Sequence, residues 1–151
     1  MLASQDQSSE FRTPVRRLAA TITFRSGVVL DVVLFCQPGE NVGHLLTSSE
    51  PFLPVEQGGK IRLVARRTLA VITTPLAENF DEEAETLTRR VSMTVRLSSG
   101  KEVEGEVAFT PRPGRPRLLD FLNEPDATLR LVGAHEVHHV SKGQIDSVEE
   151  R

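Results

Sequence analysis

A β-hairpin pattern that occurs twice constrains this chain more than any other feature. In residues 91–109, apolar side chains alternate with polar ones on both sides of a Ser-Ser-Gly turn, with Val95 before the turn and Val103 after it. Period-two spacing places one set of side chains on one face of a strand, so the pattern predicts two strands joined at Gly100. Gly105 falls on the apolar face, where a missing side chain lets a bent strand approach its neighbour closely.

The same pattern is found near the start of the chain. Placing Gly27 on Gly100 aligns residues 21–36 with the later hairpin, and the inward-facing apolar positions of the two segments coincide. With small gaps the match continues, so that residues 61–72 fall on residues 137–148. The chain therefore reads as a duplication of a unit of roughly sixty residues, a length at which a single domain is barely able to bury its own core.

The duplication divides the chain into four segments. Residues 1–17 are rich in Gln, Ser and acids and predict a disordered tail. Residues 18–75 and 91–151 are the two repeated units. Between them, residues 76–90 are acidic and carry apolar side chains at helical spacing, which predicts a linker with a short amphipathic helix.

Each unit is expected to contain five strands and one helical turn. The helical turn follows the second strand: Asn41 caps residues 42–49 in the first unit, and Pro116 starts residues 117–123 in the second. Glycines mark the tight turns between the closing strands. The sequence leaves open whether the units pack as separate bodies or as one continuous sheet.

Composition favours an ordinary globular protein. Apolar residues make up 38% and charged residues 26% of the chain, and the net charge is -3, with no strongly basic segment. No apolar run approaches the roughly eighteen residues that a spanning helix needs, so we expect a cytoplasmic protein without a membrane segment. The single cysteine, Cys36, ends an apolar strand and is expected to be a core residue.

The five short strands, the Gly-centred hairpin and the closing Lys-Gly-Gln-Ile-Asp-Ser-Val segment resemble the Sm-like small β-barrels, among them the bacterial Hfq type. The resemblance implies a mainly β protein made of two tandem five-stranded SH3-like or Sm-like barrels, each with an inserted helix. Proteins of this type bind RNA through a polar and aromatic loop after the second strand and a Lys-His pair in the closing turn. Here residues 110–123 replace that loop, Gly143 stands at the position of the histidine, and the first unit has Arg66-Arg67 there.

The segment that comes nearest to a metal site is His135-Glu136-Val137-His138-His139. On a strand Glu136 and His138 share one face and His135 and His139 the other, so each side offers at most two ligands where zinc needs three or four. We therefore expect surface histidines and no metal site. The sequence shows no nucleophile with a base and no phosphate-binding glycine loop, so we expect neither enzymatic activity nor a cofactor.

The second strand of the first unit is apolar on both faces. Val29 and Val33 stand where the second unit has Glu102 and Glu106, and Phe35 lies on the same face. Exposing all three side chains would create an adhesive patch. We predict that this face is covered by the second unit, by the linker or by another copy in a homodimer. The predicted interface residues are Val29, Val33, Phe35, Phe80 and Leu87.

The first functional hypothesis is a non-catalytic interaction or scaffold module that binds a protein partner or itself. The alternative is an Sm-like RNA-binding protein, which would use five arginines. Those arginines are Arg66, Arg67, Arg112, Arg115 and Arg117. A salt-dependent mobility shift with single-stranded RNA discriminates between the two hypotheses, because phosphate contacts weaken steeply with added salt.

Overall fold

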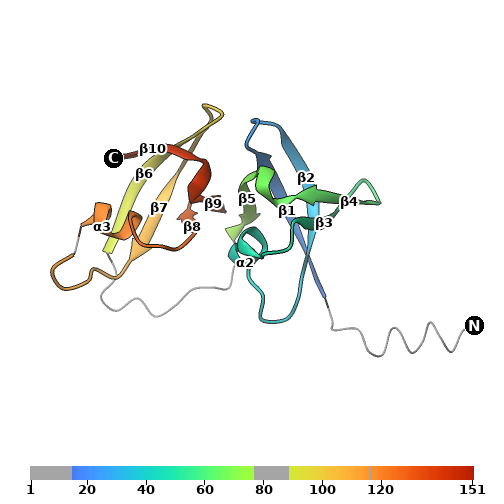
Figure 1. The fold of residues 1–151 in the computed structure, drawn as a ribbon, viewed down its shortest axis with the longest axis horizontal. Helices are drawn as coiled ribbons and strands as arrows, with labels where there is room; N and C mark the ends of the chain where they lie inside the picture. Colours follow the sequence, from blue (N-terminus) through green and yellow to red (C-terminus); the bar gives the residue numbers. More distant parts are fainter. Residues whose placement is uncertain (1–14, 77–88, 116) are drawn as a thin grey trace, which may run out of the picture.

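The computed structural model describes residues 15–76, 89–115 and 117–151, which form one mainly antiparallel β structure with two short helices (Figure 1). The first half holds five strands and one helix. They are β1 (Arg16–Phe24), β2 (Val29–Cys36), α2 (Val42–Thr47), β3 (Phe52–Gln57), β4 (Lys60–Ala65) and β5 (Leu69–Pro75). A 3-10 turn, η1 (Arg66–Thr68), joins β4 to β5.

The second half repeats this order of elements. It contains β6 (Arg89–Leu97), β7 (Glu102–Phe109), α3 (Leu118–Leu122), β8 (Thr128–Val132), β9 (Glu136–Ser141) and β10 (Ile145–Glu150). A second 3-10 turn, η3 (Lys142–Gln144), precedes β10. The predicted tail and linker fall mostly outside the described residues, but β1 and β6 begin inside those two segments.

The strands form a single ten-stranded sheet in the order β10-β6-β7-β8-β9-β5-β1-β2-β3-β4. Each half has the same internal order, and the registers agree: Ile22 pairs with Ile72 in the first half as Val95 pairs with Val148 in the second. The hairpin glycines also match, because Gly27 and Gly100 have positive φ values of 95° and 93°. The hairpins and the inserted helices are therefore where the sequence predicts them.

The predicted fold class is confirmed as mainly β, but neither of the two predicted tandem barrels is closed. Closing a five-stranded unit on itself would require its last strand to pair with its fourth. Instead β5 pairs with β9 of the other half, and the described strands make one open sheet that ends at β4 and at β10. The edge that would have closed each unit is used to join the two halves.

Two hydrophobic cores flank the strand that joins the halves. On β5, Leu69 and Ile72 pack into the core of the first half, whereas Ala70 and Val71 pack into the core of the second. Strict alternation would group Leu69 with Val71, and the strand departs from it because the pairing of β5 with β1 is irregular between Leu69 and Val71. The four side chains are 0 to 2% exposed, so β5 is buried on both faces. Cys36 is buried in the first core, as expected.

Gly105 marks a close approach between β7 and β8. A Cβ atom built on Gly105 would lie 2.9 Å from the Cβ of Leu131 and 3.2 Å from the carbonyl oxygen of Val132. The sequence-based expectation for this glycine is therefore confirmed. Val32 occupies the corresponding position on β2 and is buried in the first core. The first half therefore holds a buried side chain at the position where the second half has a glycine.

The outer face of β7 is a solvated, ion-paired row. Glu102, Glu104 and Glu106 each lie within 3.3–3.4 Å of an arginine nitrogen. The partners are Arg96, Arg151 and Arg90 respectively. These paired charges keep the outer face of β7 in water, in contrast to the apolar outer face of β2. In the described part of the chain, no helix has the length and apolar character required to cross a membrane.

Candidate protein-interaction surface

An apolar patch lies on the outer face of β3 and β4. Residues that pair across two strands point to the same face, and the register pairs Phe52 with Ala65, Pro54 with Leu63 and Glu56 with Ile61. The alternate residues of both strands, including Leu53 and Val64, point into the core. We call Phe52, Ile61 and Leu63 the edge patch, because these large side chains are 53%, 60% and 66% exposed.

The edge patch lies on a strand with a free edge. Among the described strands, β4 has β3 as its only neighbour in the sheet. A tight turn holds the two strands together, with Gly58 and Gly59 at positive φ values of 59° and 81°. An edge strand presents a row of backbone N–H and C=O groups that can pair with another strand. Hydrogen-bonding groups and apolar side chains are therefore available at the same place.

The predicted interface on β2 adjoins this patch. Val33 pairs with Glu56, which pairs with Ile61, so the three residues share one face. Val29 is 44% exposed, while Val33 and Phe35 are half-buried. The other two predicted interface residues, Phe80 and Leu87, lie outside the described residues. Whether a partner covers the β2 face stays a prediction.

Side chains of the first half shield part of the β2 face. The guanidinium carbon of Arg17 lies 5.5 Å from the centroid of the Phe35 ring, and the same guanidinium forms an ion pair with Glu56. Long cationic side chains commonly cover apolar surface with their methylene groups in this way. The most exposed apolar surface is thus on β3 and β4, where sequence reasoning did not place it.

The pairing of β5 with β9, which we call the joint, buries two histidine side chains that were expected on the surface. His139 is 3% exposed and His138 is half-buried. Nδ1 of His138 lies 2.8 Å from Oγ1 of Thr73 on β5, and its Nε2 lies 3.7 Å from a carboxylate oxygen of Glu136. The expectation of ordinary surface histidines is wrong for His138 and His139, because β5 and the helix α2 lie against β9, and it is confirmed for His135, which is exposed.

Burial controls the titration of both histidines. Burial lowers the pKa of His139 to about 4, and the neighbouring charges of Arg130 and His138 act in the same direction. Burial also lowers the pKa of His138, while Glu136 opposes that shift. Both rings are therefore neutral at pH 7. Among the described residues, no group of three or more His, Cys, Asp or Glu side chains is placed to hold a metal ion.

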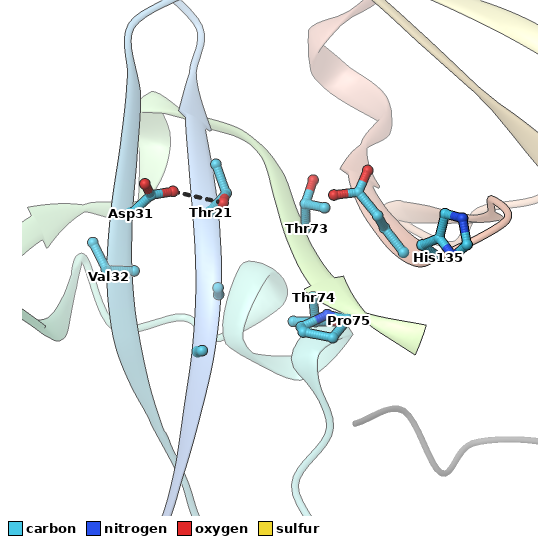
Figure 2. A pocket seen from close by; sticks show the side chains of 10 residues that line it. Thr21, Asp31, Val32, Thr73, Thr74, Pro75 and His135 are labelled. Carbon is cyan, nitrogen blue, oxygen red and sulfur yellow. Dashed lines mark hydrogen bonds between the residues drawn. The ribbon is translucent and has the colours of Figure 1, made fainter. Parts of the chain in front are cut away.

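A cavity of about 350 Å³ lies beside the joint, between β1, β2 and the start of β9. Figure 2 shows Thr21 and Asp31 on one wall and Thr73, Pro75 and His135 on the other. The Thr21 hydroxyl donates a hydrogen bond of 2.9 Å to Asp31, which satisfies both groups. The lining combines hydroxyls and carboxylates with alanine and valine side chains.

Arg66 of the proposed RNA-binding set is a structural anchor. Its guanidinium donates hydrogen bonds of 2.6 to 2.9 Å to the carbonyl oxygens of Leu45, Glu50 and Phe52. Lys142, the matching residue in the second half, donates in the same way to the carbonyl oxygens of Leu122 and Glu124. In each half, one cation therefore ties the end of the inserted helix to the turn before the last strand. Arg67 follows on η1 and is exposed.

The other three arginines of that set lie in the loop before α3 and face acidic side chains. Arg117 donates to both carboxylate oxygens of Asp120 at 3.1 Å. Arg112 lies 3.0 Å from Glu124, and Arg115 lies 4.0 Å from Asp120. The hydrogen bonds from Arg117 hold the pKa of Asp120 below its usual value. Three positive charges thus face two carboxylates. The five arginines of the set are divided between the two halves of the sheet, with Arg66 and Arg67 in the first half.

Comparison of the chain with protein-family models, curated proteins and solved structures finds no match.

Proposed function

We propose that this protein is a non-catalytic interaction module that binds another protein chain through the free edge of β4. The observation that carries this proposal is the exposure of Ile61 and Leu63, at 60% and 66%, on a strand whose outer edge is unpaired in the described part of the chain. The nearby Phe52 extends the apolar surface. Sheet proteins normally protect such edges, so an exposed apolar edge indicates a binding site.

The chemistry of the edge suits the addition of a strand. Backbone hydrogen bonds along β4 would supply affinity, and the apolar side chains would select the partner. Removing a large apolar side chain from water is worth about 1.5–3 kcal/mol, so the edge patch can offset much of the cost of association. The ion-paired glutamate row of β7 offers no comparable apolar surface.

A photo-crosslinking residue in place of Leu63 tests the proposal in cells that express the full chain. We expect discrete covalent protein adducts from position 63 and none from Lys101, an exposed turn position in the second half. Each partner identified in this way should bind the purified protein and lose binding in the Leu63→Glu variant, while Lys101→Glu keeps it. The same adducts from both positions, or none from position 63, would overturn the proposal. A salt-dependent shift of single-stranded RNA would support the alternative function.

A further inference from the structure

The strands β1 and β5 separate at the end of the joint. β5 pairs with β1 only as far as Thr73 opposite Thr21, and it then continues beside β9 as far as Pro75 opposite Glu136. Figure 2 shows β5 turning away from β1 toward Pro75. We call the opening between residues 19–21 of β1 and residues 73–75 of β5 the fork. The cavity of about 350 Å³ lies in the fork.

A proline explains why the fork opens in the first half and not in the second. In the second half the pairing of β10 with β6 continues one residue further, and the backbone N–H of Arg151 then donates to the carbonyl oxygen of Ser92 at 2.9 Å. Pro75 stands at the position of Arg151 and has no N–H to donate. The carbonyl oxygen of Ala19, the counterpart of Ser92, therefore cannot receive the equivalent hydrogen bond.

Small side chains make room inside the fork. Ala20 stands at the position of Met93, whose larger side chain is fully buried in the second core. Ala20 is 8% exposed, Val32 is 6% exposed, and both line the cavity together with the exposed Ala19. These side chains give the cavity an apolar wall. Its volume lies within the range of roughly 300–1,000 Å³ that is usual for small-molecule sites.

Two carboxylates give the fork a negative charge. Asp31 on β2 and Glu136 on β9 both line the cavity, and both are exposed. Asp31 accepts the hydroxyl of Thr21 through Oδ1, and a carboxylate has further lone pairs with which to accept hydrogen bonds from a ligand. Among the described residues that line the cavity there is no lysine or arginine. The lining therefore favours a ligand that is positively charged and donates hydrogen bonds.

Thr74 is a second, independent observation that points to a ligand. This residue lines the cavity and is 1% exposed, and its Oγ1 has no hydrogen-bond partner in the part of the chain that the structure describes. Its counterpart in the second half is the exposed Glu150. Buried hydroxyl groups are normally hydrogen-bonded, so Thr74 calls for a partner that the described residues do not supply.

An alkylammonium ion combines the properties that this lining selects. Its three N–H groups can donate to carboxylate and hydroxyl oxygens, and its charge is opposite to that of the two carboxylates. Its methylene groups suit the alanine and valine side chains of the wall. A metal ion suits the fork less well, because no group of three or more His, Cys, Asp or Glu side chains among the described residues is placed to hold one.

We propose that the fork binds the ammonium group of an alkylamine, with Asp31 and Glu136 around the charge and the alkyl chain against Ala20 and Val32. The inference goes beyond the proposed function, because β4 lies at the end of the sheet whereas β1 and β5 lie near its middle. A free amine and a lysine side chain of another protein both carry this group. The experiment separates these two sources.

Titration of the full chain with n-butylammonium chloride at constant ionic strength, followed by the backbone amide NMR signals, tests the proposal. We expect saturable shifts centred on the fork, and none with 1-butanol, which has the same chain length without the charge. Asp31→Asn/Glu136→Gln should raise the dissociation constant by roughly tenfold or more. The matched control is Glu102→Gln/Glu104→Gln, which removes two exposed carboxylates of β7 and should leave the dissociation constant within about twofold.

A variant that keeps the charge tests the shape of the site. Ala19→Leu places a larger side chain in the fork at an exposed position of β1, and it should weaken butylammonium binding by a similar factor. Its melting temperature, like those of the double variants, shows whether the protein is folded. Unchanged binding in the folded Ala19→Leu variant, equal weakening in the two double variants, or equal shifts with 1-butanol would overturn the proposal.

A blocked lysine peptide identifies the source of the amine. Acetyl-glycyl-lysyl-glycinamide carries the same ammonium group on a peptide side chain. Tighter binding of this peptide than of butylammonium assigns the fork to a lysine of a protein partner, and tighter binding of butylammonium assigns it to a free amine. Either result supports the site, whereas shifts with neither probe overturn it. Crosslinks from position 63 would still support the proposed function in that case.

Discussion

β4 and β9 occupy the same place in the two halves of the sheet, yet their surroundings are opposite. Val137 on β9 is fully buried while Ile61 on β4 is 60% exposed, and the imidazole of His139 is 3% exposed while the matching Leu63 is 66% exposed. A polar ring is buried and an aliphatic side chain is solvated. The strand that pairs with the outer edge, rather than the chemistry of the side chains, therefore decides which positions are buried.

The last strands of the two halves, β5 and β10, differ in the same sense. β5 presents Thr73 and Thr74 to the joint, whereas the matching residues of β10 are Glu149 and Glu150. Charged side chains on an edge strand discourage indiscriminate pairing. β4, at the other end of the sheet, carries the exposed bases Lys60 and Arg62 instead. The inner joint is therefore uncharged at these positions, and the outer ends are charged with opposite signs.

The largest expected effect comes from placing a charge inside the joint. Val137→Asp buries an unpaired carboxylate between the two halves and should lower the free energy of unfolding by about 3–5 kcal/mol. Ile61→Asp, at the matching position of β4, should change it by no more than about 0.5 kcal/mol, because that side chain stays in water. Urea unfolding at a concentration where the chain is monomeric measures both values. Equal losses in the two variants would contradict the comparison.

The buried histidine makes the joint sensitive to pH. The pKa of His139 is lowered to about 4 in the folded protein, compared with 6.5 in the unfolded chain. Between these values the unfolded chain binds more protons, so stability is complete above about pH 6.5 and falls as the pH drops toward 4. The loss attributable to His139 is about 3 kcal/mol. Urea unfolding at several pH values between 7 and 4.5 measures it.

Exchanging the two matched residues sharpens that test. His139→Leu copies the residue of β4 and should remove most of the pH dependence, leaving the smaller part due to His138, whose pKa burial also lowers. Leu63→His copies the residue of β9 to an exposed position, where the imidazole can be protonated in water, so no new pH dependence is expected. An unchanged slope in His139→Leu would show that other groups carry the effect.

The smallest expected effect concerns a single hydrogen bond across the joint. Thr73→Val removes the hydroxyl that lies 2.8 Å from Nδ1 of His138. Because His138 is half-buried, the free energy of unfolding should fall by about 1 kcal/mol. Thr23→Val provides the control, because Thr23 is also half-buried on the adjacent strand β1, and its loss should stay within about 0.5 kcal/mol. Thermal unfolding compares the two variants. A loss no greater than that of the control would show that the bond contributes nothing.

Local patterning in the sequence was sufficient for the elements of each half. Alternation about Gly27 and Gly100 located both hairpins, and Asn41 marked the start of α2, where its side chain accepts a hydrogen bond from the backbone of His44. The role of Gly105 also followed from its place on the apolar face. These features depend on residues close together in the chain, where side-chain period and turn conformation leave few alternatives.

The candidate surface was only partly accessible to sequence reasoning. The apolar outer face of β2 pointed to the correct half, and Val33 shares a face with Ile61. The edge patch itself was missed, because the match of Ile61 to Val137 gave no sign that the two side chains differ in exposure. The sequence signal for the exposed edge patch was that the aliphatic Leu63 stands where the second half has the polar His139.

The sequence by itself therefore determined the strands, the alternation of side chains between the two faces of each strand, and the inserted helices. Only the tertiary structure decided that β5 pairs with β9, that the sheet is open and that β4 and β10 are its ends. The physical reason is that strands are joined by backbone N–H and C=O groups, which are the same for nearly every residue, so side-chain pattern specifies which face is buried but not which edge is paired. The exposure of Leu63 and the burial of His139 both follow from that choice of edge.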